Sequence, residues 1–124
     1  MKRAAVIVAS AIALSCGGGS APSTPSPVPA NPFTFTITAA GVSPKEYTVP
    51  PGTRVLFVNN DSRSHAMSSD PHPDHTDCPA INAAGTLGSG QSRETGNLND
   101  VRTCGFHDHD NPDNASLKGR IIIR

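Results

Sequence analysis

Short apolar segments, separated by turns that contain glycine or proline, are the feature that most restricts how this chain can fold. Residues 33–38 alternate strictly between apolar and polar side chains, which is the period of a half-buried strand. Further strand candidates lie at residues 46–49, 53–59, 93–98, 100–103 and 118–124. A Pro-Pro-Gly turn at residues 50–52, with 11 Gly and 12 Pro among 124 residues, argues against long helices. The pattern predicts an all-β sandwich or barrel.

Residues 60–85 show no clear strand pattern and are expected to form a long loop. This stretch holds His65, His72, His75 and Cys78. A loop of this length in a small domain is more often functional than idle. We therefore expect it to contribute to a site.

The composition limits both the core and the partners. Aromatic residues make up 4% of the chain and Trp is absent, so the core must come from Ile, Val, Leu and a few Phe. A small domain with such a core is expected to gain stability from a metal or a disulfide. The formal net charge is zero and there is no basic patch, so nucleic acid is not an expected partner.

The N-terminal segment predicts export rather than structure. Lys2 and Arg3 precede an apolar stretch, residues 4–14, that is too short to span a bilayer. Residues 13–16 resemble a bacterial lipobox, with Cys16 as the lipidated residue. The alternative is an ordinary cleaved signal peptide.

Three parts of the chain follow from this interpretation. Residues 1–15 are expected to be a lipoprotein signal peptide, residues 16–32 a tether rich in Gly, Ser and Pro, and residues 33–124 the folded domain. The domain is then held to the membrane by its lipid anchor, in the bacterial cell envelope, facing the periplasm or the exterior. With a cleaved signal peptide it would instead be a soluble periplasmic or secreted protein.

A Cys-x-x-His-x-His motif, formed by Cys104, His107 and His109, precedes the last strand candidate. A thiolate together with an imidazole suits copper or zinc rather than calcium or magnesium. His65 follows the apolar strand candidate at residues 53–59 and can supply one more imidazole. All five histidines lie in these two regions, residues 60–85 and 104–109, and the sequence predicts that the two regions meet in a metal site at one end of the sandwich.

Three stretches together resemble the cupredoxin (plastocyanin/azurin-like) family of blue copper proteins. They are VPPGTRVLFVNND at residues 49–61, LGSGQS at residues 87–92, and CGFH at residues 104–107 followed by KGRI at residues 118–121. The resemblance implies a Greek-key β-sandwich that binds one copper ion per chain. It also implies that His65, Cys104 and His107 are the equatorial ligands and that the site transfers electrons to a redox partner protein.

The chain departs from that family at two places. Leu117 stands where the family has an axial Met, so the fourth ligand would be absent or would come from His109, Asp110 or a backbone carbonyl. The loop at residues 67–79 has no counterpart in ordinary plastocyanins. It adds a set of lower-ranked candidate ligands: Met67, His72, His75 and Cys78.

Cys104 has two possible roles, and the sequence leaves both open. As a thiolate it would bind copper. If Cys16 carries lipid, however, Cys78 and Cys104 are the remaining cysteines, and in an oxidising compartment such a pair usually forms a disulfide. The metal, copper or zinc, would then be held by imidazoles and carboxylates in a pale centre.

Three functions remain in view, and the first two are favoured over an enzyme. One is electron transfer. The second is copper storage, delivery or resistance with a copper donor or acceptor as partner, and the third is a mononuclear copper enzyme with an open axial position. Residues 105–109 are also similar to the Gly-Phe-His-x-His of copper-zinc superoxide dismutases, but there the motif comes early, whereas here only a short strand follows it.

Overall fold

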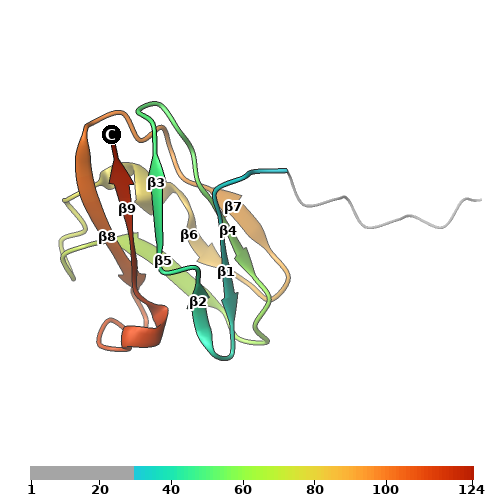
Figure 1. The fold of residues 1–124 in the computed structure, drawn as a ribbon. Coiled ribbons are helices and arrows are strands. Elements are labelled where there is room, and N and C mark those ends of the chain that lie inside the picture. The colour runs from blue at the N-terminus through green and yellow to red at the C-terminus, as the bar shows by residue number, and fades with distance from the viewer. Residues whose placement is uncertain (1–29) are drawn as a thin grey trace, which may run out of the picture.

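The computed structural model describes residues 30–124 as two β-sheets packed face to face (Figure 1). The strands are β1 (Thr34–Thr38), β2 (Gly41–Ser43), β3 (Glu46–Val49), β4 (Leu56–Asn59), β5 (His65–Ser69), β6 (Gly85–Leu87), β7 (Ser92–Glu94), β8 (Arg102–Asp108) and β9 (Gly119–Ile123). Two short 3₁₀ helices are η1 (Pro79–Ala83) and η2 (Ala115–Leu117). The all-β sandwich that the turn pattern predicts is confirmed.

The order of strands brings the C-terminal strands beside β5 in the middle of the chain. One sheet has the order β2-β1-β4-β7 and the other β3-β9-β8-β5-β6. The pairs β1 with β4 and β3 with β9 are parallel, and the other pairs are antiparallel. Because β8 lies between β5 and β9, the C-terminal histidines lie beside the segment that follows β5.

Three phenylalanine rings join the sheets. Phe106 of β8 packs against Phe35 of β1 and Phe57 of β4, with ring centroids 4.8 and 5.0 Å apart, and all three rings are fully buried. Gly119 of β9 lies directly against the Phe106 ring, and a side chain at this position would collide with it. Aromatic burial of this kind supplies much of the core in a domain with so few aromatic residues.

Two sequence-based expectations about segments are wrong. Residues 60–85 are not one loop, because they contain β5, η1 and β6. The strand β5 was not evident because its buried positions include the polar residues His65 and Ser69, which breaks the apolar alternation. The Cys-x-x-His motif, which follows the strand candidate at residues 100–103, lies inside the longer strand β8.

The predicted signal peptide, lipidated Cys16 and most of the predicted tether fall on residues 1–29 and lie outside the described residues. Within residues 30–124, no helix has the length and apolar character needed to cross a membrane.

Replacing Phe106 with Ala should destabilise the domain by about 3–5 kcal/mol, because it removes the ring that joins the sheets and leaves a cavity. Chemical denaturation measures this change. Val101→Ala is the control, since Val101 is 71% exposed and its truncation should stay within about 0.5 kcal/mol. Equal stabilities of the two variants would contradict the assigned role of Phe106.

Candidate metal centre

The alternation of β8 sorts its side chains onto two faces. Cys104, Phe106 and Asp108 are fully buried and belong to the inner, core-facing set. Successive side chains of a strand point to opposite faces, so Gly105 and His107 belong to the outer face. His109, directly after β8, continues the outer set.

The segment from residues 70 to 78 covers this outer face. The Asp70 N–H donates to the carbonyl of Gly105 at 3.0 Å, and the Cys78 N–H donates to Ser69 Oγ at 2.8 Å. A disulfide joins Cys78 to Cys104. These contacts hold the segment at both ends, and His107 beneath it is only 1% exposed.

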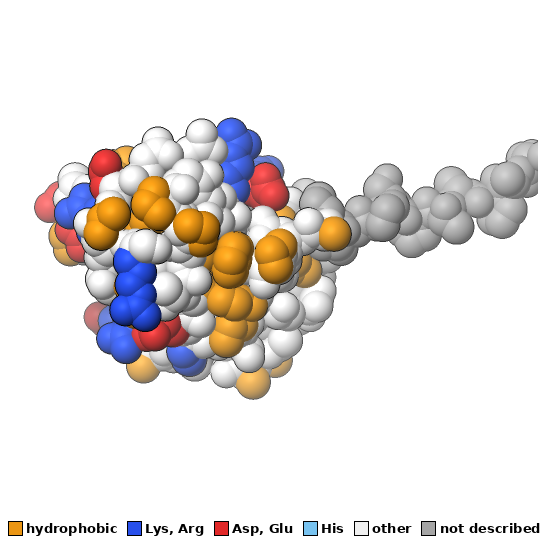
Figure 2. Space-filling view, turned by 45° about the horizontal axis from the view of Figure 1, so that its top comes forward, with side chains coloured by type: hydrophobic (Ala, Val, Ile, Leu, Met, Phe, Trp, Pro, Cys, Tyr) orange, Lys and Arg blue, Asp and Glu red, His pale blue; other side chains and the backbone are white. Residues whose placement is uncertain are grey.

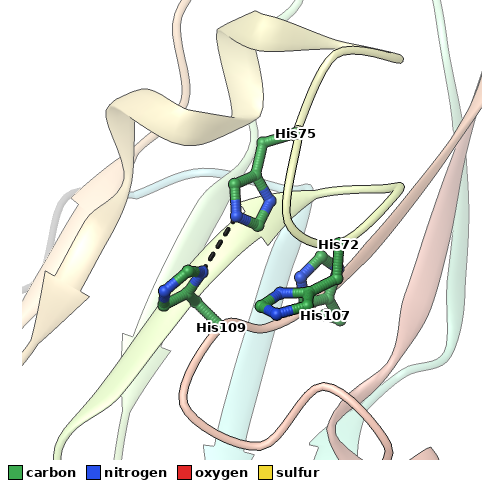
Figure 3. Close-up of side chains that lie close together, drawn as sticks. All are labelled: His72, His75, His107 and His109. Carbon is green, nitrogen blue, oxygen red and sulfur yellow. Dashed lines mark hydrogen bonds between the residues drawn. The ribbon is translucent and has the colours of Figure 1, made fainter.

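Four imidazoles meet between this segment and the end of β8: His72, His75, His107 and His109 (Figure 3). One ring nitrogen of each lies within 4.8 Å of the corresponding nitrogens of the others. His107 is buried, His75 is half-buried, and His72 and His109 are exposed. The cluster therefore has a closed side and an open side.

No histidine shows on the face drawn in Figure 2, where hydrophobic and charged side chains are interspersed.

Hydrogen bonds at Nδ1 of His107 and of His75 determine which ring nitrogen carries the lone pair. His107 Nδ1 is 2.6 Å from the Asp70 carboxylate, and His75 Nδ1 is 2.8 Å from the Ser69 carbonyl. Both partners accept, so in each neutral ring Nδ1 carries the hydrogen and Nε2 carries the lone pair. Such outer hydrogen bonds are what orients metal-binding histidines in proteins.

The Nε2 atom of His107 is the one buried side-chain nitrogen or oxygen within residues 30–124 that has no hydrogen-bond partner. An unpaired buried polar atom is costly and calls for a physical explanation, such as an ion. His75 Nε2 is 2.9 Å from His109 Nδ1. In the absence of metal this contact pairs an N–H of His109 with the lone pair of His75.

The remaining ring, His72, is shifted toward its neutral form. Desolvation, followed by repulsion from His109, His107 and His75, lowers the pKa of His72 below its ordinary value of 6.5. A neutral imidazole is the form that binds a metal. The cluster thus fits a metal that prefers nitrogen ligands, which includes copper, zinc and nickel.

The ligand set that the family resemblance implied is not assembled. Cys104 is bonded to Cys78, so its sulfur is not a free thiolate, and it lies on the inner face while His107 lies on the outer face. The structure thus has the disulfide alternative. Leu117 is buried in the core, and Met67 is fully buried there too, at one of the inward positions of β5.

His65, expected to be a ligand, has both ring nitrogens engaged in the core. Its Nε2 is 2.8 Å from Asp61 Oδ2 and its Nδ1 is 2.8 Å from Asp108 Oδ2. Each ring nitrogen of His65 is therefore directed at a carboxylate oxygen in the core. Both nitrogens are thus occupied by partners in the core, and His65 is not part of the histidine cluster.

Both carboxyl groups around His65 favour their ionised form. The hydrogen bond from His65, assisted by Arg63 and the Ser62 N–H, lowers the pKa of Asp61 to about 2 against the opposing effect of burial. Burial alone would raise the pKa of Asp108, but hydrogen bonds from His65, the Ala66 N–H, Asn111 and the Asp110 N–H together lower it. Asp61, His65 and Asp108 thus form a buried polar group that holds the end of β8 in place.

Sequence reasoning missed two residues of the site, Asp70 and Gly105. Asp70 orients His107, and its carboxylate lies where a side chain at position 105 would be, so only glycine leaves room for it. The glycine inside Cys-Gly-Phe-His was visible, but its packing against a residue far away in the sequence was not.

Comparison with solved structures identifies the fold as cupredoxin-like. A purple cupredoxin from Nitrosopumilus maritimus is 19% identical, with a TM-score of 0.57 over 73% of this chain and 98% of that chain. Amicyanin from Paracoccus versutus is 18% identical, with a TM-score of 0.62 over 78% and 85%. A fern plastocyanin is 18% identical, with a TM-score of 0.57 over 73% and 99%. Amicyanin variants of this fold have been solved in oxidised and in Cu(I) forms.

No protein-family model matches the chain, and no curated protein sequence matches it. The likeness in structure therefore confirms the expected cupredoxin-like Greek-key sandwich, and the site has to be interpreted from this chain's own residues.

Replacing Asp61 with Asn should lower stability at neutral pH, and the difference from the unaltered protein should shrink in acid. The folded pKa of Asp61 is depressed from 3.8 to about 2, so its contribution is complete above the unfolded value and is lost as pH falls through the folded value. Denaturant unfolding at several pH values between about 5 and 2 measures this. Asp100→Asn, at an exposed position, is the control. A difference that does not depend on pH would contradict the argument.

Replacing both Cys78 and Cys104 with Ala should cost about 3 kcal/mol of stability, because the disulfide closes a sequence separation of 26 residues. It should also weaken metal binding, since the disulfide ties the segment that carries His72 and His75 to β8. Denaturation and metal titration measure the two effects. A dithiol reductant, in the absence of added metal, should reproduce the loss of stability in the unaltered protein and leave the stability of the double variant unchanged. Unchanged metal affinity would mean that the backbone hydrogen bonds alone position the segment.

Proposed function

We propose that this protein binds one copper ion per chain on His72, His75, His107 and His109. The observation that carries the proposal is the buried, unpartnered Nε2 of His107, surrounded by three further imidazoles. Asp70 and the Ser69 carbonyl hold two of the rings, His107 and His75, with the lone pair on Nε2. Binding an ion satisfies a nitrogen that otherwise has no partner.

Copper is the favoured metal for a chemical reason. Imidazole nitrogens bind several divalent metals, and affinities at such sites generally rise to copper and fall again at zinc. Because Cys104 is in a disulfide, it cannot provide a thiolate ligand for the metal. A copper(II) centre of this kind would be pale, without an intense thiolate-to-copper absorption band.

Copper handling, meaning storage, delivery or resistance, is the role that we infer for the site. Two of the four ligands, His72 and His109, are exposed, so a partner protein that donates or accepts copper can reach the metal directly. The disulfide supports an oxidising compartment. With the predicted leader and Cys16, it supports a place in the cell envelope, with a lipid anchor in the membrane.

Electron transfer is the second candidate. The cupredoxin-like fold and the oxidised and Cu(I) forms of amicyanin favour it, and the exposed His109 ring would give a redox partner protein a short path to the metal. A reversible one-electron couple of the copper-loaded protein would support this role. The absence of such a couple, with copper exchange to a chelator intact, would favour handling.

The direct test is copper titration of the protein under non-reducing conditions, followed by calorimetry and EPR. We expect one ion per chain, a pale spectrum and nitrogen hyperfine structure. His72→Ala and His109→Ala should each weaken binding at least as much as the loss of an outer hydrogen bond to a ligand, about 10- to 100-fold. Both positions are exposed, so folding should be preserved.

Two variants serve as controls. Asp74→Ala changes an exposed residue of the same segment and should leave copper affinity unchanged. His65→Asn removes a histidine outside the cluster, and copper binding should persist in the folded fraction. Two results would overturn the assignment in favour of the ligand set that the family resemblance implied. One is an intense visible absorption band of the copper-loaded protein. The other is that the folded His65 variant fails to bind copper while the His72 and His109 variants still bind it.

A further inference from the structure

A hollow of about 590 Å³ opens beside the histidine cluster, and its chemistry goes one step beyond metal binding. His72 and His107 form part of its wall, and Lys118, Asp113 and Asp70 line the rest together with two prolines. We propose that this hollow admits a small monovalent anion, which binds the copper ion as an additional ligand. This inference rests on the proposed function.

The hollow borders two of the proposed metal ligands. The wall includes His107, whose Nε2 is the buried nitrogen without a partner, and His72, whose ring centroid lies 5.4 Å from that of His107. These two rings belong to the set that would hold the metal. A molecule in the hollow therefore lies beside two of the rings that would hold the ion, of which His72 is the exposed one.

The charge of the ligand set favours an anion. Four neutral imidazoles leave the whole charge of a divalent ion uncompensated by its direct ligands. The Asp70 carboxylate, which is hydrogen-bonded to His107 Nδ1 at 2.6 Å, is not a direct ligand, but its negative charge lies in the wall of the hollow and acts against an anion there. A bound divalent ion is the largest local charge in such a site, so it attracts a negative ligand.

Lys118 and Asp113 act in opposite directions on that attraction. The Lys118 side chain is exposed and lies directly before β9, where it adds a positive charge to the hollow. Asp113 adds a negative charge and acts electrostatically on His72. The two residues thus offer changes of opposite sign at one site, which makes the inference sharply testable.

Azide is the probe that we would use, in a chloride-free buffer of low ionic strength. The copper-loaded protein is titrated with azide and followed by the azide-to-copper absorption band and by EPR. Lys118→Gln should weaken azide binding about two- to fivefold, as expected for one exposed charge pair, and Asp113→Asn should strengthen it. Both variants should keep their copper affinity. Arg124→Gln is the matched control, because Arg124 is an exposed cation at the other end of β9.

The outcomes separate this inference from the proposed function. Failure of copper to bind in the first titration overturns the function and, with it, the anion site. Copper binding with no change of the spectrum on adding azide overturns the anion site alone. Azide binding that is equal in the Lys118, Asp113 and Arg124 variants also overturns it, because the anion would then reach the metal from another side.

Discussion

The two-residue period of β8 is the constraint on which the rest of this structure depends. One set of its side chains enters the core, where Phe106 joins the two sheets. The other set faces outward under the segment that follows β5, where His107 meets the other imidazoles. Because successive side chains alternate, core and metal site are built from interleaved residues of one strand. A shift of register by one residue would exchange the two sets and destroy both.

The disulfide decides which of two possible metal sites this chain can have. By joining Cys78 to Cys104 it removes the thiolate, and it fastens the histidine-bearing segment over β8. At the inner face, His65 is held between two carboxylates rather than presented to an ion. The cupredoxin-like sandwich therefore keeps its architecture while the proposed copper centre lies on the outer side of the same strand.

The proposed metal site has one buried side and one open side, and this difference suits it to metal exchange. Its buried side, around His107, is rigidly supported by Asp70, which itself depends on the absence of a side chain at Gly105. Its open side, with His72 and His109, faces solvent and the neighbouring hollow. Support on one side orients the donors, and exposure on the other leaves room for exchange of metal or for a further ligand.

Local pattern alone was enough to predict the all-β class, most of the strands and the concentration of histidines at one end of the domain, because turn residues and two-residue alternation act between near neighbours. It also presented the disulfide as an alternative. Only the tertiary structure decided between the roles of Cys104, turned His65 toward the core and brought Asp70 against Gly105. Each of these depends on which face of a strand meets which distant segment, and sequence spacing carries no information about that contact.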